Sequence, residues 1–489
     1  MISDTRVALT EAEVNKGLKF GIGDGLTTEA MTTLTGTTFL VAMALMLGAS
    51  NFEIGLLAAF PTFTNVFQLI SIWLVRRFKS RRLVSVACSI IARLPLILTG
   101  LVILFIKPPS IQPVLIFFFF YNLFGSIAGP SWNAWMKDLI PENLLGAYFA
   151  KRSSYMQMLN IVLSLILALA LEYIRKHYPS YELSAYAVMF ILAGIAGITG
   201  AFVLAKVPEP QSTLTVENIF HVLRKPLKDE NFRRLLVFNS VWLFAVNIAT
   251  PFFVVFMMKS MGLSLPFIIG LTIISQLFSI FTIRAWGRYA DKYSNKTIIA
   301  IGGPLYILCL AAWCFAGIYS HFAMNLAWLI LIHIAMGISN AGINLSLTNI
   351  GLKLAPRDES IIYLAAKNII TAVFASVAPL LGGYLADFFT KRSLVVNAEW
   401  VGPRFSKTIH LVSLHEWNFL FLIGAVLALI SLEFLIPVKE TGEVDKDEVR
   451  RIMRSTFRNS MKDYFVIGQL ISWQEQLWRM LRRRNAMRS

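Results

Sequence analysis

The sequence predicts an all-α membrane protein with twelve transmembrane helices, arranged as two parallel repeats of six. The 489 residues are 56% hydrophobic and only 15% charged, and the mean hydropathy is +0.64, which is more apolar than a soluble protein of this length. Apolar runs of about 20 residues recur along the chain, which is the length a helix needs to cross the hydrocarbon core. Two landmarks also recur at one fixed spacing, and this indicates the repeat.

The apolar runs define the expected membrane helices. Helices are expected because the runs are too long for barrel strands, and because backbone groups in lipid must be bonded internally. The expected spans are 26–47, 54–75, 83–106, 113–135, 148–174, 185–204, 235–257, 266–285, 297–319, 326–350, 361–388 and 417–436. Residues 1–19 are polar, show no cleavable signal pattern and are expected to lie at the surface.

Charge and composition divide the chain into four parts. We expect an N-terminal six-helix bundle over 1–206, a cytoplasmic linker over 207–231, a C-terminal six-helix bundle over 232–436 and a basic amphipathic cytoplasmic tail over 437–489. The net charge is +17, and most Lys and Arg residues fall on the side that holds both termini. Basic loops favour the cytoplasm, so this excess sets topology and argues against nucleic acid as a partner.

The basic tail has apolar residues at helical spacing. This pattern predicts helices that lie on the anionic lipids of the inner leaflet. A second interpretation is a docking helix for a partner or for the inner mouth of the protein.

The repeat rests on a charged turn and a proline turn. At an offset of 215 residues the turn at 287–296 falls on the turn at 76–81, with Lys292, Tyr293 and Lys296 on Arg77, Phe78 and Arg81. The same offset places Pro141, Tyr148 and Arg152 on Pro356, Tyr363 and Lys367. An even number of crossings separates the copies, so they lie in the same orientation, which is a known plan among membrane transporters.

The first expected helix carries an unusual number of polar groups. Asp24, Thr28, Thr32 and Thr35 share one face, and Glu29 lies beside it. A carboxylate inside a membrane helix is costly, so it should face protein or water. The alternative is that both carboxylates begin the helix in the headgroup zone, where negative charge suits the helix dipole. In the next helix Glu53 has capping-box spacing after Ser50, so it is expected to be a cap.

Further polar residues lie inside the expected spans. Arg93 either lines a cavity or pairs with Asp24 or Glu29; the alternative is packing against carbonyls freed by Pro95. Two stripes of small and polar residues serve either close helix packing or a cavity. They are Asn122, Ser126, Gly129 and Asn133, and His333, Gly337, Asn340 and Asn344. His333 could carry a proton, but a hydrogen-bonded packing role is favoured.

Other features complete the sequence-based picture. The connection over 389–416 is rich in β-formers around Gly402-Pro403, so a small hairpin is expected there. Cys88, Cys309 and Cys314 lie in apolar runs and are interpreted as small buried hydrophobes. The sequence shows no metal-ligand cluster, nucleotide loop or nucleophile constellation, so we expect no enzyme activity, no cofactor and no metal.

The charged turn Gly287-x-x-Ala290-Asp291-Lys292-x-x-x-Lys296 resembles the loop signature of the major facilitator superfamily. The resemblance covers about residues 20–436 and implies two six-helix bundles that rock about a central cavity. Three departures argue against proton antiport. Arg76 stands where the family has an aspartate, Leu145 stands where an arginine is common, and the middle of the fourth helix lacks the arginine of proton antiporters.

The resemblance also implies a cytoplasmic gate. We expect the pairs Asp291–Arg152 and Arg76–Glu359 to form when the inner side closes, with Lys292, Lys296 and Lys367 as further members of the gate. The alternative is that these charges only set topology.

The function that the resemblance implies is secondary transport of a small molecule by alternating access. Protons are a possible coupling ion through Asp24 or Glu29, and facilitated diffusion is the alternative. The cavity and coupling candidates are Asp24, Glu29, Arg93, Asn122, Trp132, Asn133, His333, Asn340 and Asn344. The other hypotheses are a drug or lipid exporter of this fold and a non-transporting receptor or scaffold that signals through its tail. We expect a monomer in a bacterial inner membrane, with both termini cytoplasmic.

Overall fold

The computed structural model describes residues 10–210, 225–317, 321–356, 360–402 and 405–440. The tail beyond residue 440, most of the linker and Glu359 therefore lie outside the described residues. The first group of elements is α1 (Glu11–Leu34), α2 (Thr37–Met46), α3 (Asn51–Phe63), η1 (Thr64–Phe67), α4 (Gln68–Phe78), α5 (Arg81–Phe105), α6 (Ile111–Leu139), α7 (Glu142–His177), η2 (Pro179–Tyr181) and α8 (Glu182–Leu204). The second group is α10 (Lys225–Lys228), α11 (Glu230–Asn247), α12 (Phe252–Lys259), α13 (Leu265–Tyr293), α14 (Asn295–Trp313), α15 (Phe322–Leu354), α16 (Ser360–Phe389), β1 (Ser393–Gly402), β2 (Phe405–His415) and α17 (Trp417–Glu433).

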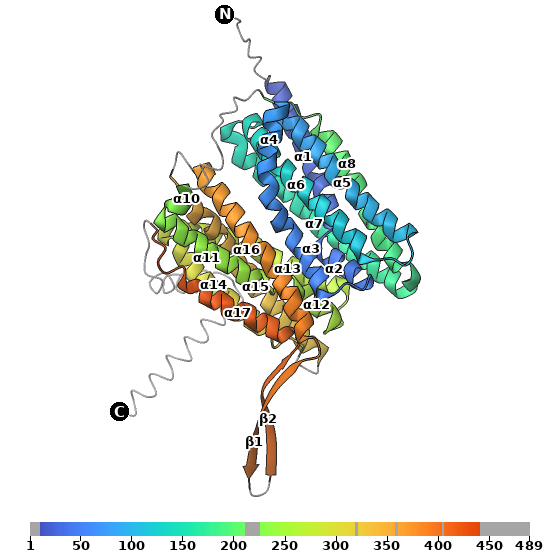
Figure 1. Ribbon diagram of the computed structural model, residues 1–489, viewed down its shortest axis with the longest axis vertical. Helices are drawn as coiled ribbons and strands as arrows, with labels where there is room; N and C mark the ends of the chain where they lie inside the picture. Colours follow the sequence, from blue (N-terminus) through green and yellow to red (C-terminus); the bar gives the residue numbers. More distant parts are fainter. Residues whose placement is uncertain (1–9, 211–224, 318–320, 357–359, 403–404, 441–489) are drawn as a thin grey trace, which may run out of the picture.

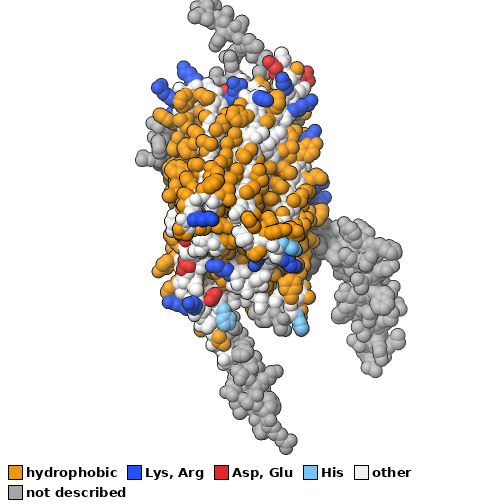
Figure 2. Space-filling view, turned by 90° about the vertical axis from the view of Figure 1, so that its right-hand side faces the viewer, with side chains coloured by type: hydrophobic (Ala, Val, Ile, Leu, Met, Phe, Trp, Pro, Cys, Tyr) orange, Lys and Arg blue, Asp and Glu red, His pale blue; other side chains and the backbone are white. Residues whose placement is uncertain are grey.

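The predicted fold class is confirmed. Among the described residues, eleven helical segments are long and apolar enough to cross a membrane, and α17 is a shorter apolar helix of 17 residues. Figure 2 shows hydrophobic side chains over the middle of one face, with Lys and Arg gathered towards its two ends. An exposed apolar belt of this kind is stable only in lipid. The chain is an integral membrane protein.

The helices form two groups that meet mainly at one end. Figure 1 shows α1–α8 (blue to green) beside α10–α17 (green to red), with the β1–β2 hairpin projecting from one end. We call this the hairpin end. The opposite end, which holds the α4–α5 and α13–α14 turns, is the hinge end. Between the groups, α16 packs along α3, α13 packs on α7, and α12 contacts α2.

The first helix begins earlier than its apolar run. Thr10 and Glu13 form a capping box, so α1 starts at Glu11 rather than near residue 26. The expected start of the first helix at residue 26 is therefore wrong, while residues 10–19 are mostly exposed, as expected. Asp24 lies 13 residues inside the helix, about 20 Å from its start at 1.5 Å per residue. It does not begin the helix, and it is buried.

Two local predictions are confirmed. Ser50 and Glu53 form the expected capping box at the start of α3, because each side chain accepts from the other residue's backbone N–H. The expected hairpin is β1 paired antiparallel with β2, with a register shift between Val396 and Asn397. Both features depend on local sequence alone, which explains why they could be predicted.

Candidate functional site: a charged cavity closed at the hairpin end

A cavity of about 470 Å³ lies within the first group of helices. Its lining comes from α1, α3, η1 and α4–α8, and reaches Leu204, the last residue of α8, at the hinge end. Its polar lining residues are Asp24, Thr28, Thr32, Thr64, Asn65, Gln68, Ser85, Ser89, Arg93, Tyr121, Asn122, Ser126, Trp132, Asn133 and Arg152. A concave site with a few converging charged groups is the usual form of a small-molecule site.

The centre of this cavity is an ion pair between α1 and α7. Arg152 Nη2 lies 3.5 Å from Asp24 Oδ2, and both side chains are largely buried. Arg152 Nε also donates to the carbonyl oxygen of Gly21 at 3.1 Å, and its guanidinium lies 4.8 Å from the centre of the Trp132 ring. Gly25 leaves room for this arrangement, because an added Cβ would lie 2.7 Å from Arg152 Nε. Arg152, expected only as a gate residue, is therefore a cavity residue in this structure.

Arg93 is the second cation at the cavity. Its Nη1 donates to the carbonyl oxygen of Ser89 at 2.7 Å, and its charge interacts with Asp24 and with Tyr121. Its Nε is buried without a hydrogen-bond partner among the described residues. The structure thus combines two of the expected roles, since Arg93 lines the cavity and also bonds to a backbone carbonyl.

Glu29 lies one turn beyond Asp24 on α1 and is half-buried. Its carboxylate interacts with Asn160 and with Arg152, both on α7. Asn160 Nδ2 also donates to Thr33 Oγ1 at 3.0 Å, which ties α7 to α1. Glu29 is therefore linked to the Asp24–Arg152 pair, although it is not part of the cavity lining.

The predicted stripe on α6 faces this cavity. Asn122, Ser126, Gly129 and Asn133 all line it, and Ser126 Oγ donates to the carbonyl oxygen of Thr64 at 2.8 Å. On the neighbouring segment, which runs from η1 into α4, Gln68 Nε2 donates to Asn65 Oδ1 at 3.0 Å. These bonds fix the Ser126 hydroxyl and the Asn65 and Gln68 amides before any ligand binds.

The corresponding stripe on α15 is not part of this lining. His333 is buried beside Trp313, with 5.5 Å between the ring centres, and its Nδ1 bonds to the carbonyl oxygen of Leu329 at 2.8 Å. It lies in an aromatic cluster with Phe253 and Phe421 around Trp313, which gives it a packing role here. Asn340 and Asn344 are exposed and bond to each other at 3.4 Å. The sequence could not show that only the α6 stripe lines the 470 Å³ cavity, since helical spacing does not tell whether a polar face borders a cavity or a packed interface.

The hairpin end is sealed between the two groups of helices. Asp387 at the end of α16 accepts from the backbone N–H groups of Asn51 and Phe52 at 3.2 and 3.0 Å, so it caps α3 in the other group. Gly55 lies against the carbonyl oxygen of Pro379, and an added Cβ at Gly383 would lie 2.8 Å from Phe52 Cα. Backbone contact this close is possible only for glycine.

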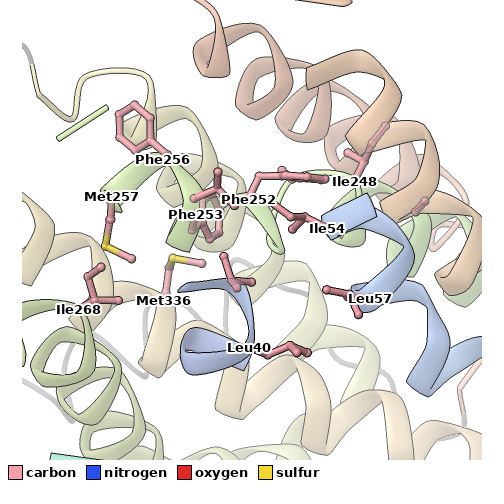
Figure 3. Close-up of a cluster of buried hydrophobic side chains, with 14 of the residues drawn as sticks. Leu40, Ile54, Leu57, Ile248, Phe252, Phe253, Phe256, Met257, Ile268 and Met336 are labelled. Carbon is pink, nitrogen blue, oxygen red and sulfur yellow. The ribbon is translucent and has the colours of Figure 1, made fainter. Parts of the chain in front are cut away.

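Apolar side chains fill the space behind this contact. Figure 3 shows Leu40, Ile54 and Leu57 from the first group facing Ile248, Phe252, Phe253 and Met336 from the second. Each of these side chains is buried. The seal therefore combines apolar burial with the capping of α3 by Asp387, a role that the sequence did not indicate.

The hinge end has polar contacts within each group. Glu209 accepts from Arg81 N and Ser80 Oγ at 2.5 and 2.6 Å, at the start of α5. Glu440 does the same at the start of α14, accepting from Asn295 N at 3.2 Å and Lys296 N at 2.7 Å. Glu209 and Glu440 each follow the last helix of their group. This shared position in the sequence is a signal from which the two contacts could have been predicted. Arg81 also pairs with Asp138.

The predicted gate pair Asp291–Arg152 is not among the ion pairs of the described residues, and Glu359, the predicted partner of Arg76, lies outside them. Asp291 is exposed at the end of α13, while Arg152 is engaged with Asp24. Lys292 lies 5.1 Å from the centre of the Tyr293 ring, and Lys296 Nζ donates to the carbonyl oxygen of Ile436 at 3.0 Å. Arg76 is half-buried in the last turn of α4. The pairing of Asp291 with Arg152 stays a prediction for a state in which the hinge end is closed.

The 215-residue offset extends to the ion pair. It places Asp24 on Asn239, Arg152 on Lys367 and Trp132 on Leu347. Lys367 Nζ donates to the carbonyl oxygen of Leu347 at 2.5 Å. In the first copy, the equivalent contact is that of Arg152 with the Trp132 ring. Neither side-chain amide atom of Asn239 has a hydrogen-bond partner among the described residues. The second copy thus keeps the cation but replaces the carboxylate with an amide.

Comparison with known proteins agrees with this architecture. The family model of the Major Facilitator Superfamily matches residues 26–360. No curated protein sequence matches the chain.

Similar solved structures include the nucleoside transporter NupG in its D323A form, with 13% identity, a TM-score of 0.64 and coverage of 87% of this chain and 100% of that one. The xylose transporter XylE from E. coli, in an inward-open conformation, shares 15% identity at a TM-score of 0.57, with 90% and 99% coverage. A POT family transporter in complex with 5-aminolevulinic acid shares 13% identity at a TM-score of 0.58, with 86% and 95% coverage. These likenesses concern the fold. The chain belongs to the Major Facilitator Superfamily and is a secondary transporter of a small molecule.

Proposed function

We propose that the protein moves a polar small molecule by alternating access, in which two six-helix bundles rock about the charged cavity. The observation that carries this proposal is the asymmetry between the two ends. The hairpin end is sealed by Asp387 on α3 and by the cluster in Figure 3, while the cavity reaches Leu204 at the hinge end. This arrangement corresponds to a conformation closed at the hairpin end and open at the hinge end.

The proposed orientation places the hinge end in the cytoplasm of a bacterial inner membrane, with both termini on that side. The support is the basic charge of the hinge-end turns, including Arg76, Arg77, Lys79 and Arg81 at the α4–α5 turn. The transporter in this structure would then be inward-open.

The ion pair offers a mechanism for coupling. When Asp24 is charged, it holds Arg152 inside the first bundle. Protonation of Asp24 would weaken this bond, so Arg152 could reach Asp291 of the second bundle and close the hinge end. Arg152 thus serves either the cavity or the gate, and a proton on Asp24 or Glu29 selects between them. Arg76 and Glu359 would form the corresponding pair on the other side of the gate.

The cavity lining supports a polar substrate. Amides, hydroxyls and three charged groups are part of a lining that also has apolar surface, and a lipid or an apolar drug would leave these polar groups without partners. The similar structures carry names that refer to a nucleoside, to xylose and to 5-aminolevulinic acid, which are chemically different molecules. They do not favour one substrate over another.

The proposal is tested by ligand screening followed by transport. Purified protein is screened by thermal shift against metabolites and drugs at two pH values, since a ligand of the native state raises the melting temperature. Stabilising compounds are then assayed for uptake into proteoliposomes, with and without a proton gradient. We expect uptake that is lost in Arg93→Met and no longer responds to the gradient in Asp24→Asn. Binding without uptake would support a receptor and contradict the proposal.

A further inference from the structure

A second cavity, of about 210 Å³, lies between the two groups of helices. Its lining comes from the break between α1 and α2, from α7, and from α13 of the other group. Thr32 lines both this cavity and the larger one, so the two adjoin at α1. The smaller cavity is therefore placed where one ligand would touch both groups of helices.

Three of the six hydroxyl groups in this lining donate to carbonyl oxygens of their own helices, which leaves these oxygens as acceptors. Thr272 Oγ1 donates to the carbonyl oxygen of Ile268 at 3.0 Å, Ser164 Oγ to that of Ile161 at 3.2 Å, and Thr32 Oγ1 to that of Glu29 at 3.0 Å. A hydroxyl has one hydrogen to donate and two lone pairs. With the hydrogen used inside its own helix, each oxygen keeps accepting capacity for a ligand.

The lining also contains groups that can donate, and the described residues that form it include no charged side chain. Gln276 can donate and accept, as can Thr38. The carboxylate of Glu29 on α1 interacts with Asn160 and Arg152. Phe39 and two isoleucines supply the apolar part of the wall. An ammonium or carboxylate group would be desolvated here without a counter-charge, which is costly inside a membrane protein.

The cavity is much larger than a bare metal ion. At about 30 Å³ for each water, 210 Å³ corresponds to about seven waters, which is the scale of a small ring. A hydroxyl-rich group both donates and accepts, whereas an ammonium only donates. The cavity thus matches a neutral polyhydroxylated group in size, charge and hydrogen-bonding pattern.

We infer that this cavity is the subsite for a neutral, polyhydroxylated part of the transported molecule, while the remainder of the molecule lies in the 470 Å³ cavity beyond Thr32. The inference rests on the proposed function and names the substrate class for the same pathway. Because Thr272 and Gln276 belong to α13 and Asn160 and Ser164 belong to α7, an occupant bonds across the interface between the groups. Its binding therefore favours the approach of the two groups.

The test uses the full chain in detergent and two probe sets of matched size. One set contains neutral sugars and polyols, and the other contains amines and carboxylic acids without hydroxyl groups. Glucose against glucosamine is a matched pair within this design, because one hydroxyl is replaced by an ammonium. We expect stabilisation by members of the first set, and weaker stabilisation when an ammonium replaces a hydroxyl.

Two variants locate the binding. Thr272→Val removes a hydroxyl of the cavity. Thr199→Val is the matched control, because Thr199 Oγ1 makes the same bond to its own helix, to Ile195 at 2.9 Å, but is exposed and outside both cavities. We expect Thr272→Val to weaken binding about three- to tenfold, the loss of about one hydrogen bond, and Thr199→Val to leave it unchanged.

The outcomes separate this inference from the proposed function. Three results would overturn the inference, whether or not uptake occurs. They are stabilisation only by compounds without hydroxyls, stabilisation by neither set, and equal binding in the two variants. Binding of a sugar or polyol that is sensitive to Thr272→Val supports the subsite, and if it came without uptake it would contradict the transport proposal alone.

Discussion

Arg152 Nη2 lies 3.5 Å from Asp24 Oδ2, and this buried ion pair joins α7 to α1. The equivalent positions in the second copy are Lys367 and Asn239, so the second copy holds a cation without a carboxylate. At these equivalent positions, one group of helices thus has a breakable ion pair and the other has a cation beside an amide.

This asymmetry predicts unequal costs for removing the two cations. Arg152→Met leaves Asp24 buried without its partner, and breaking such a pair costs about 3–5 kcal/mol. Lys367→Met leaves an amide at the equivalent position, so its cost should be nearer to about 1 kcal/mol, the loss of one hydrogen bond. Thermal unfolding in detergent measures both.

The double variant Arg152→Met with Asp24→Asn serves as the control for this prediction. It removes the orphaned charge together with its partner, so it should recover much of the lost stability. Equal losses in Arg152→Met and Lys367→Met, or no recovery in the double variant, would show that the pair is not what distinguishes the bundles.

A second prediction concerns Asp387. Asp387→Asn weakens two charge-assisted bonds to the start of α3 and should loosen the hairpin end. In a background without the three native cysteines, a cysteine at Ile54 inside the seal should react with a water-soluble maleimide about tenfold faster, which corresponds to about 1.4 kcal/mol. Glu53→Gln is the matched control, because Glu53 bonds only within its own helix start. The same maleimide reaction rate in both variants would show that Asp387 does not hold the hairpin end closed.

A third prediction separates Glu440 from the part of the tail that follows it. Glu440 is fully buried and also accepts from Lys353 Nζ at 3.0 Å. A chain that ends at Val438 loses this carboxylate, so it should be destabilised by about 2–4 kcal/mol, as should full-length Glu440→Ala. A chain that ends at Asp445 should keep the stability of the full chain. If the two truncations unfolded at the same temperature, the structural role of Glu440 would be excluded.

A fourth prediction concerns the gate. A charge reversal at Arg152 would place a second carboxylate beside Asp24, so it cannot report on Asp291 alone. Cysteines that replace Asp291 and Lys151 avoid this problem, because Lys151 is exposed and is next to Arg152 in the sequence. We expect them to cross-link only when the hinge end closes, as in the Gly55→Val variant described below. Cross-linking at the same rate in the unmodified background and in that variant would contradict the gate.

The sequence predicted the features that depend on pattern. Apolar runs located the helices, and β-formers located the hairpin. Five of the nine cavity candidates line the 470 Å³ cavity, namely Asp24, Arg93, Asn122, Trp132 and Asn133, and four do not, namely Glu29, His333, Asn340 and Asn344. The sequence paired Arg93 rather than Arg152 with the carboxylates, because the approach of α7 to α1 is a tertiary contact between residues 128 apart. The role of Asp387 was equally hidden, since its partners are backbone N–H groups in the other bundle.

The central claim is that the two ends open and close reciprocally. Gly55 packs against the backbone at Pro379, so Gly55→Val should force the hairpin end apart. An added Cβ at Gly146 has open space around it, so Gly146→Val is the matched control. Spin labels at the exposed residues Phe105 and Ser260 report on the hairpin end, and labels at Lys137 and Leu352 report on the hinge end.

Double electron–electron resonance on these two label pairs is the most direct test. We predict that Gly55→Val lengthens the Phe105–Ser260 distance and shortens the Lys137–Leu352 distance, while Gly146→Val changes neither. A hairpin end that opens while the hinge-end distance stays constant would contradict alternating access in this protein.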